Sequence, residues 1–367
     1  MLTGTAPEDQ DLIYVPYWRF KGVLYSCMNS RKIEHRFMDI SRKAVTNSFS
    51  PDSLGFRSQA LKLRFVSPET SGSFLKPDIT KPTVMENIRH MFNAAIRDPF
   101  FHQEFIGENL SMIYSPVYVK NRRVYDGVLN APISPESSPE PVPEDMKTSP
   151  PDQHIRFIPA LCPSCGWDLA GARDSMALHC RHCSTVWYPT HEGLQKLPVR
   201  IVSRTDGATD LFLPFWKIRG DISGVELNTY ADLIRAANLP KVIQPARHDK
   251  PFYFWCPAFK IRPKEFLRFS AALSLDQPDS LPASRLPDNG LYPVNLPITE
   301  AAESVKINLI NLLNSPRFSP EQLRDITVHA RAYSLVYIPF QQTPHEIIHP
   351  QLNFAVNKHL IDLSHNL

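Results

Sequence analysis

Four cysteines stand in two Cys-x-x-Cys pairs separated by fourteen residues, in the segment CPSCGWDLAGARDSMALHCRHC. They are Cys162, Cys165, Cys180 and Cys183. Each pair forms a tight turn that aims two thiolates at one point, and two such turns close a tetrahedron around Zn²⁺ at roughly 2.3 Å per bond. Gly166 follows the first pair, where the turn needs a positive φ. We therefore predict one metal site per chain, with zinc as its ion.

Four thiolates leave no open coordination position for water or substrate, which indicates a structural ion and disfavours catalysis by it. A mononuclear iron would use the same ligands and is the alternative metal. The paired spacing disfavours the other alternative, in which the cysteines simply pack in a core. His179 and His182 could replace a ligand, but with four cysteines available we expect them to be exposed turn residues.

The sequence after the second pair, STVWYPTHEGLQKLPVRIV, predicts two strands joined by a glycine-containing turn. These strands would complete a three-stranded sheet. Together with the two Cys-x-x-Cys turns, residues 157–203 resemble the zinc-ribbon group, whose cysteine turns are broadly rubredoxin-like. The resemblance covers this segment only, and it implies a metal site without implying an activity.

A second metal-binding string, HEIIH, runs from His345 to His349. In zinc metalloproteases such a string lies on one helix, where both histidines bind the metal and the glutamate acts as the base. Here Pro344 and Pro350 stand directly before and after the string, and a proline at its end prevents a helix from continuing. A metal-dependent hydrolase is therefore a remote alternative, and we expect a strand or a turn.

Basic residues alternate with apolar ones in four strand-like segments. A strand period of two places the basic residues of each segment on one face. The pairs are Arg19 with Lys21, Lys62 with Arg64, Lys217 with Arg219, and Lys260 with Arg262. If the strands of each half pair, each half carries a four-charge patch that could bind phosphates or an acidic protein segment. The alternative is that these are ordinary solvated faces of half-buried sheets.

The chain also contains an internal repeat. Three pairs of segments match: 13–22 with 211–220, 60–64 with 258–262, and 111–116 with 334–339. In the first pair, IYVPYWRFKG and LFLPFWKIRG share proline, tryptophan and glycine at the same positions, and the second pair keeps the same offset. We infer that one ancestral unit was copied. Trp18 and Trp216 are then expected to be buried at equivalent positions, and the basic residues beside them to be exposed.

A helix is predicted before the third matching segment of each copy. Residues 84–96 and 301–313 space their apolar residues at three and four, as a helix with one buried stripe does. Pro99 and Pro316 follow and end these helices. Each copy therefore reads as strands, a helix and closing strands, which predicts an α+β fold with largely antiparallel sheets.

Residues 131–153 hold seven prolines and five acidic residues without apolar periodicity, which predicts an extended linker. The expected organisation is a first copy (1–130), a Pro/Ser/Glu-rich linker (131–155), a zinc ribbon (156–203) and a second copy (204–367).

The composition is that of a folded chain. Of 367 residues, 43% are apolar and 21% are charged, so enough apolar surface exists to bury a core. A net charge of +3 does not by itself indicate a nucleic-acid or membrane partner. Cys27 and Cys256 lie singly in apolar segments, which favours inert core thiols in a reducing compartment. With no apolar run of about 18 residues, we expect a cytoplasmic protein without a membrane span.

These observations together predict a non-catalytic zinc-binding protein that serves as an interaction or assembly platform for a protein partner. The alternative from another class is a nucleic-acid-binding factor, in which the ribbon and the basic strands contact phosphates.

Overall fold

The computed structural model describes residues 1, 11–56, 62–67, 70–95, 98–121, 123–133, 158–190, 192–202, 211–240, 242, 245–283, 285–313, 317–349, 351–352 and 354–362. The predicted linker lies outside these residues except for its first three. The chain forms two compact units. The first comprises Met1–Gly22, Phe37–Asp98 and Glu108–Arg156, and the second comprises Val23–Arg36, Pro99–Gly107 and Phe157–Leu367.

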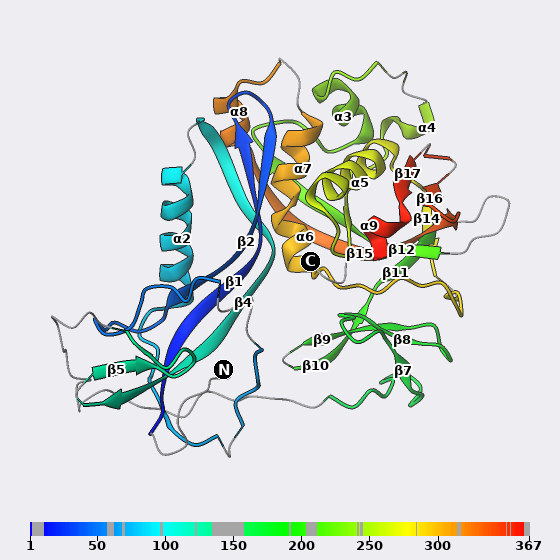
Figure 1. Cartoon of the computed structure of the whole chain (residues 1–367). Coiled ribbons are helices and arrows are strands. Elements are labelled where there is room, and N and C mark those ends of the chain that lie inside the picture. Colours follow the sequence, from blue (N-terminus) through cyan, green and yellow to red (C-terminus); the bar gives the residue numbers. More distant parts are fainter. Residues whose placement is uncertain are drawn as a thin grey trace. The chain divides into compact units, whose positions relative to one another are not determined.

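The first sheet has the strand order β2-β1-β4-β5-β6, with β3 paired in parallel to β1. The helix α2 (Lys81–Ala95) lies beside this sheet and buries Val84 and Ile88, which are one helical turn apart (Figure 1). The strands are β1 (Ile13–Met28), β2 (Ile33–Lys43), β3 (Ser73–Phe74), β4 (Phe100–Lys120), β5 (Arg123–Asp126) and β6 (Ala131–Pro132).

A small sheet with the order β10-β9-β8-β7 carries the cysteine pairs. Its strands are β7 (Leu169–Ala170), β8 (Leu178–Cys180), β9 (Val186–Thr190) and β10 (Gly193–Leu197). All its pairings are antiparallel. The sheet has four strands where the sequence predicted three, because the short β7 after the first cysteine pair also joins it.

The third sheet has the order β13-β12-β15-β11-β14, and β16 and β17 extend it from β15. The pairing is antiparallel except between β11 and β15. Its strands are β11 (Val199–Val202), β12 (Leu211–Ser223), β13 (Phe254–Pro257), β14 (Ser280–Pro282), β15 (Thr327–Gln342), β16 (Glu346–His349) and β17 (Phe354–Asn357). Residues 199–202, which the sequence assigned to the ribbon, thus belong to this larger sheet.

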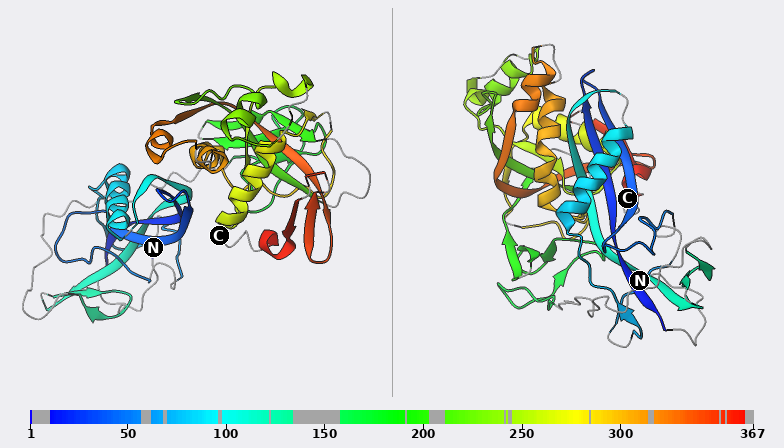
Figure 2. Two further views of the ribbon diagram at one scale, coloured as in Figure 1. Left: turned by 90° about the horizontal axis from the view of Figure 1, so that it is seen from above. Right: turned by 90° about the vertical axis from the view of Figure 1, so that its left-hand side faces the viewer.

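The helix α5 (Pro263–Asp276) packs on this third sheet beside α7 (Val305–Leu312) (Figure 2). Proline at its first position fits the helix start, and Phe266, Phe269 and Leu273 form its buried stripe. The predicted helix of residues 301–313 is present as two helices that meet at Ser304. The remaining helices of the second unit are α3 (Tyr230–Ala236), α4 (Pro245–His248), α6 (Ile298–Glu303), α7 (Val305–Leu312), α8 (Pro320–Asp325) and α9 (Lys358–Asp362).

The predicted α+β class with largely antiparallel sheets is confirmed: two larger sheets accompany the small four-stranded one. Among the described helices, none is long and apolar enough to cross a membrane.

The end of β1, the start of β2 and the start of β4 belong to the second unit, which includes Val23–Arg36 and Pro99–Gly107. Tyr25, Cys27 and Phe101 from these parts lie in the large hydrophobic core of that unit. The ring of Tyr25 lies 6.4 Å from that of Phe266 on α5. β1 and β4 therefore supply core residues to the second unit and strands to the sheet of the first.

One set of backbone hydrogen bonds occurs twice, once around Ala44 in the first half of the chain and once around Ala258 in the second half. Each alanine donates its N–H to a proline carbonyl and accepts two N–H groups from a later segment. In the first half the partners are Pro16, Asp78 and Ile79, and in the second half they are Pro214, Asn295 and Leu296. The structural counterpart of Ala258 is thus Ala44. The sequence match of residues 60–64 with 258–262 was wrong in this respect, because a short pattern of alternating basic residues can arise without common geometry.

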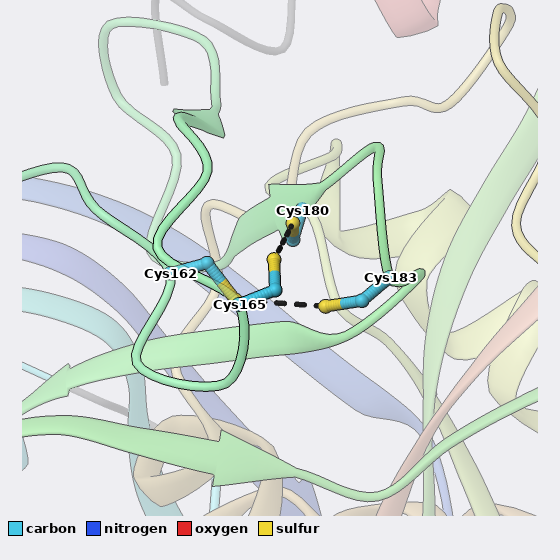
Figure 3. Close-up of side chains that lie close together, drawn as sticks. All are labelled: Cys162, Cys165, Cys180 and Cys183. Atoms are coloured by element: carbon cyan, nitrogen blue, oxygen red, sulfur yellow. Dashed lines mark hydrogen bonds between the residues drawn. The ribbon is translucent and has the colours of Figure 1, made fainter.

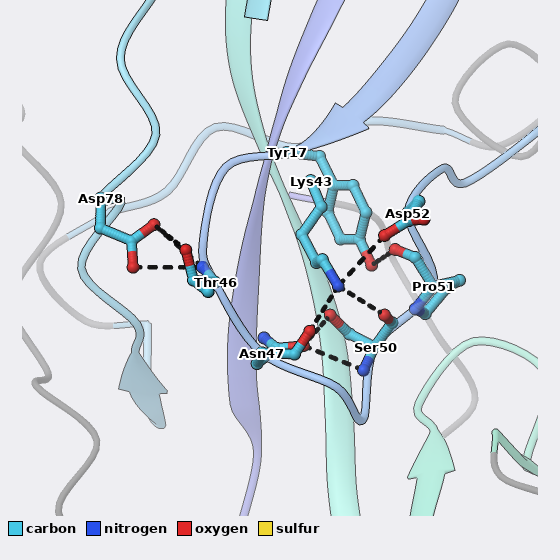
Figure 4. Close-up of polar contacts among 8 residues, drawn as sticks. All are labelled: Tyr17, Lys43, Thr46, Asn47, Ser50, Pro51, Asp52 and Asp78. Carbon is cyan, nitrogen blue, oxygen red and sulfur yellow. Dashed lines mark hydrogen bonds and ion pairs between the residues drawn. The ribbon is translucent and has the colours of Figure 1, made fainter. Parts of the chain in front are cut away.

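Side chains repeat the same arrangement. The indole N–H of Trp18 donates to the carbonyl of Ile79 at 2.8 Å, and that of Trp216 donates to the carbonyl of Leu296 at 2.9 Å. The carboxylate of Asp78 accepts the N–H of Thr46 (Figure 4). In the same way, the side-chain oxygen of Asn295 accepts the N–H of Lys260. Trp216 is fully buried, as expected, whereas Trp18 is only partly buried. Counting back from the paired alanines, Asp39 in the first half corresponds to Tyr253 in the second.

The closing strands also repeat with one register. Tyr118 pairs with Tyr125 between β4 and β5, and Gln341 pairs with Ile348 between β15 and β16, at the offset of the third sequence match. Asp126 and His349 then occupy the same place. Each is buried and accepts a backbone N–H from the turn that follows it.

A loop of the first unit is held by a partly buried cation. The ammonium of Lys43 donates to the carbonyls of Asn47 and Ser50 and pairs with the carboxylate of Asp52 at 3.3 Å (Figure 4). The hydroxyl of Tyr17 donates to the carbonyl of Pro51. These contacts fix the loop that follows β2, at the position where the second half continues into α5.

Candidate metal centre

The four predicted cysteines converge in one cluster. Cys162 Sγ lies 3.6 Å from Cys183 Sγ, and Cys165 Sγ lies 3.4 Å from Cys180 Sγ (Figure 3). All four sulfur atoms lie within 4.8 Å of one another. Four sulfurs at 2.3 Å from a common centre are about 3.8 Å apart in a tetrahedron. The cluster therefore fits one metal ion, plausibly zinc.

Backbone conformation explains how the turns form. The N–H of Cys162 donates to the carbonyl of Trp167, and the N–H of Gly166 donates back to Cys162. Gly166 has φ of 74°, as predicted, and Ser184 takes the same place after the second pair with φ of 54°. In both turns the residue after the last cysteine adopts the left-handed conformation, which lets the chain reverse beside the sulfurs.

Thr185 supports two of the sulfurs. Its hydroxyl lies 3.1 Å from Cys183 Sγ and 3.4 Å from Cys162 Sγ, and it accepts the indole N–H of Trp187 at 2.9 Å. Because the oxygen accepts from the indole, its own proton is free to point at a sulfur. Outer contacts of this kind orient metal ligands and tune their charge. Nothing in the spacing of the cysteines predicted the role of Thr185.

The same hydrogen bonds favour thiolates. Burial opposes the charged form of Cys162, but hydrogen bonds from Thr185 and from the backbone of Ser164 and Cys165 outweigh it and lower the pKa of this thiol to about 6. The hydrogen bond from Thr185 also lowers the pKa of Cys183. Thiolate is the form that binds a metal ion, so Cys162 and Cys183 are prepared as ligands. The backbone hydrogen bond at Trp167 lowers the pKa of Cys165, but desolvation and the hydrogen bonds with the other three cysteines outweigh it and raise this pKa to about 12.

The small sheet that carries the cysteines is hydrogen-bonded to the C-terminal half of the chain, and both belong to the second unit. His179 Nε2 lies 2.6 Å from the phenol oxygen of Tyr337 on β15. The N–H of Met176 donates to the carbonyl of Val294. The side-chain amide of Asn295 donates to the carboxylate of Asp174 at 3.1 Å.

The two histidines near the cluster have different environments. His182 is exposed, as expected, and its ring stacks on Trp167 at 5.2 Å. His179 was expected to be an exposed turn residue, but it lies on β8, and burial lowers its pKa. The expectation failed because Tyr337, its hydrogen-bond partner, is 158 residues away in sequence.

The predicted basic strands form only in part. Arg19 and Lys21 lie on β1, and Lys217 and Arg219 lie on β12. Lys21 and Arg219 are exposed, whereas Arg19 and Lys217 are partly buried. Arg19 makes two hydrogen bonds to Asp39, at 2.7 and 2.6 Å, so its charge is already paired.

The other two basic pairs do not lie on strands. Lys62 and Arg64 flank an isolated bridge residue, and Lys260 and Arg262 lie in the connection between β13 and α5. Arg262 is the residue that precedes the first turn of α5. A four-charge patch built from paired basic strands is therefore absent from the described part of both halves, because alternation in sequence does not by itself create a strand.

The HEIIH string lies on a strand. Glu346–His349 form β16, which pairs with β15 and β17. His345 is exposed, and His349 is buried with its Nδ1 accepting the N–H of Leu352. Among the described residues, the four cysteines are the one group of three or more His, Cys, Asp or Glu side chains close enough to share an ion.

The two remaining cysteines are core residues. Cys27 and Cys256 are buried, and burial raises the pKa of each, to about 12 and about 11 respectively. Neutral thiols are poor nucleophiles and poor ligands.

Comparisons of the chain with protein-family models, with curated proteins and with solved structures found no match. The site itself therefore defines the class: a chain with a four-cysteine cluster within a small antiparallel sheet, consistent with a zinc-binding knuckle.

Proposed function

We propose that this chain is a zinc-binding protein in which the ion has a structural role and takes no part in catalysis. The observation that carries the proposal is the convergence of four cysteine sulfurs within 4.8 Å. Four thiolates complete a tetrahedral shell, so a bound zinc ion has no position left for water or substrate.

The zinc ion stabilises the ribbon against the second half. β8 carries both Cys180 and His179, and His179 bonds the buried Tyr337. The contacts of Met176 and Asp174 come from the segment between β7 and β8. Fixing the cysteines therefore fixes the strand and the loop that contact the second half.

The two halves descend from one duplicated unit under this proposal. Support comes from the recurring hydrogen bonds of Ala44 and Ala258, from the two tryptophan anchors and from the common register of the closing strands. A pair of related binding units joined through a metal-stabilised module suits a platform that assembles other proteins.

The ribbon supplies a surface for such a protein partner. Its large apolar side chains include Ile158, Leu161 and Trp167, of which Leu161 is 51% and Trp167 59% exposed. Exposed aromatic and aliphatic groups next to one another are typical of protein interfaces. The nucleic-acid alternative has less support, because Arg19 is paired with Asp39 and two of the basic pairs lie off the strands.

The metal assignment is tested by elemental analysis and X-ray absorption on the purified full chain. We expect one zinc per chain with four sulfur neighbours at about 2.3 Å. If the analysis finds iron in the same sulfur shell, the alternative metal is correct and zinc is not. A second metal equivalent that His345→Ala removes would contradict the proposal in favour of the hydrolase.

The platform is tested by affinity capture from native cells, with and without nuclease. We expect associated protein to survive nuclease and moderate salt, and to be lost on Trp167→Ala while the zinc content stays at one. Loss of all association after nuclease, or a steep fall with salt, would favour the nucleic-acid alternative instead.

A further inference from the structure

A cavity of about 550 Å³ lies on the third sheet and contains none of the metal ligands. Several neighbouring strands contribute to it. The residues that matter here are Arg200 on β11, Lys217 on β12, Pro282 on β14, Tyr333 and Ser334 on β15, and Tyr253 before β13. Its wall thus combines two cations with aromatic and apolar surface.

Among the described residues that line this cavity, none is an anionic partner for Lys217. Its ammonium lies 4.4 Å from the ring centre of Tyr253 and 5.3 Å from that of Trp255, and it donates no hydrogen bond to a described residue. Asp279, the acidic group whose charge acts on it, is paired with Lys250. The aromatic rings stabilise the cation in part, but its three N–H donors remain unused.

Arg200 keeps donors free as well. Its guanidinium uses Nε for the hydroxyl of Ser280 and one Nη2 hydrogen for the carbonyl of the same residue. A guanidinium has five N–H donors, so three are left without a partner among the described residues. The two hydrogen bonds also hold the guanidinium plane in a fixed orientation at the cavity wall.

The first half shows what this position looks like when the charge is neutralised within the chain. Arg19, the counterpart of Lys217, is bonded through two nitrogens to Asp39. In the second half the counterpart of Asp39 is Tyr253, whose ring cannot neutralise a cation. A charge that the first half pairs internally is therefore left for an external anion in the second.

We propose that this cavity binds a small organic anion, with a carboxylate or phosphate group held by Lys217 and Arg200 and an apolar or aromatic body against the tyrosine and proline walls. Two oxygens of a carboxylate or of a phosphate fit the remaining N–H pair of the guanidinium. The cavity volume is in the range of small-molecule sites.

The titration of Lys217 agrees with this geometry. Burial is the main effect that lowers the pKa of Lys217, and the charges of Arg200 and Lys250 lower it further. Asp279 opposes this shift, and the resulting pKa is about 8. A bound anion favours the ammonium form and raises this pKa. Affinity is then full below pH 8 and falls as the pH rises through that value. Tyr253 and Tyr333 are the other titratable groups at the wall.

The test is calorimetric titration of the purified, metal-loaded full chain with phenyl phosphate, benzoate and inorganic phosphate. We expect saturable binding of one phenyl-bearing anion per chain, tighter than that of inorganic phosphate. Lys217→Met and Arg200→Gln should each weaken it by about tenfold or more. Arg219→Gln is the matched control, because Arg219 is an exposed cation on the same strand outside the cavity.

Whichever of phenyl phosphate and benzoate binds more tightly identifies the anionic group, and either outcome supports the site. Thermal unfolding of each variant checks that the fold is kept, and Arg200→Lys replaces Arg200→Gln if the latter is unstable. The proposal is overturned by the lack of saturable binding up to about 10 mM. It is also overturned by an equal loss in Arg219→Gln, or by inorganic phosphate binding as tightly as phenyl phosphate.

Discussion

The phenol of Tyr337 and the imidazole of His179 are joined by a 2.6 Å hydrogen bond. Tyr337 is fully buried on β15, a strand at the centre of the third sheet. His179 precedes Cys180, a member of the four-cysteine cluster, on β8. One side-chain contact thus connects the cysteine cluster with the core of the second half.

Tyr337→Phe removes the hydroxyl and leaves the partly buried ring nitrogen of His179 without its partner. We expect the free energy of unfolding to fall by about 1–3 kcal/mol, the cost of orphaning a buried polar group. Tyr333→Phe is the matched control, since Tyr333 is 38% exposed and should change stability little. Equal effects of the two variants in denaturant unfolding would argue against a special role for the contact.

Removal of the metal should unfold the ribbon. Structural zinc contributes on the order of 10 kcal/mol of binding free energy to small zinc modules, so a strong chelator, or Cys180→Ser, should abolish the ordered ribbon. We expect zinc to fall from one per chain to none, and protease cleavage to appear between residues 158 and 197. Cys27→Ala, which changes a buried cysteine outside the cluster, should keep one zinc per chain. A Cys180→Ser protein with full zinc content would refute the assignment.

The two tryptophan anchors should differ in cost. Trp216→Phe orphans the carbonyl of Leu296 and opens space in a fully buried site, and we expect a loss of about 2–4 kcal/mol. Trp18→Phe removes the equivalent bond at a partly buried site, where water can replace the indole. Its cost should be smaller by about 1 kcal/mol or more. Chemical denaturation of both variants decides this, and a larger loss for Trp18→Phe would contradict it.

His349 should make the second half sensitive to acid. Burial lowers the pKa of this histidine below its ordinary 6.5. The unfolded chain then takes up a proton more readily than the folded one as the pH falls below 6.5, so stability is full above that value and decreases beneath it. Protonation also removes the Nδ1 acceptor for the N–H of Leu352. Unfolding measured across this range should show the loss.

His349→Asn provides the comparison, because its amide oxygen can accept the same N–H without titrating. We expect the variant to lose the part of the acid sensitivity that begins near pH 6.5. Unchanged pH dependence in the variant would show that other groups are responsible.

Sequence spacing was sufficient for the cysteine cluster, because two Cys-x-x-Cys turns are local structures whose geometry is determined within a few residues. The same holds for Gly166, whose positive φ follows from the turn. The third repeated segment was also predicted correctly, since β4 with β5 and β15 with β16 pair in the same register. The first repeated segment keeps its tryptophan hydrogen bond in both halves.

The sequence could not predict which basic side chains are neutralised by a partner within the chain. Arg19 and Lys217 occupy matching places in the repeat, yet one is paired with Asp39 and the other lies over Tyr253 beside a cavity. Which partner a basic side chain finds depends on the neighbouring strand, which is tens of residues away. Residues 60–64 failed for the same reason: alternation indicated a strand, but no neighbouring strand pairs along it in the described part of the chain.

The sequence by itself determined the four-cysteine cluster, the α+β class and two of the three repeated segments, because each depends on short-range periodicity or on fixed local spacing. Tertiary structure alone decided that His179 bonds Tyr337, that Ala44 is the counterpart of Ala258, and that Lys217 and Arg200 share a cavity. These relationships depend on pairing between distant strands, whose register is set by the packing of whole sheets.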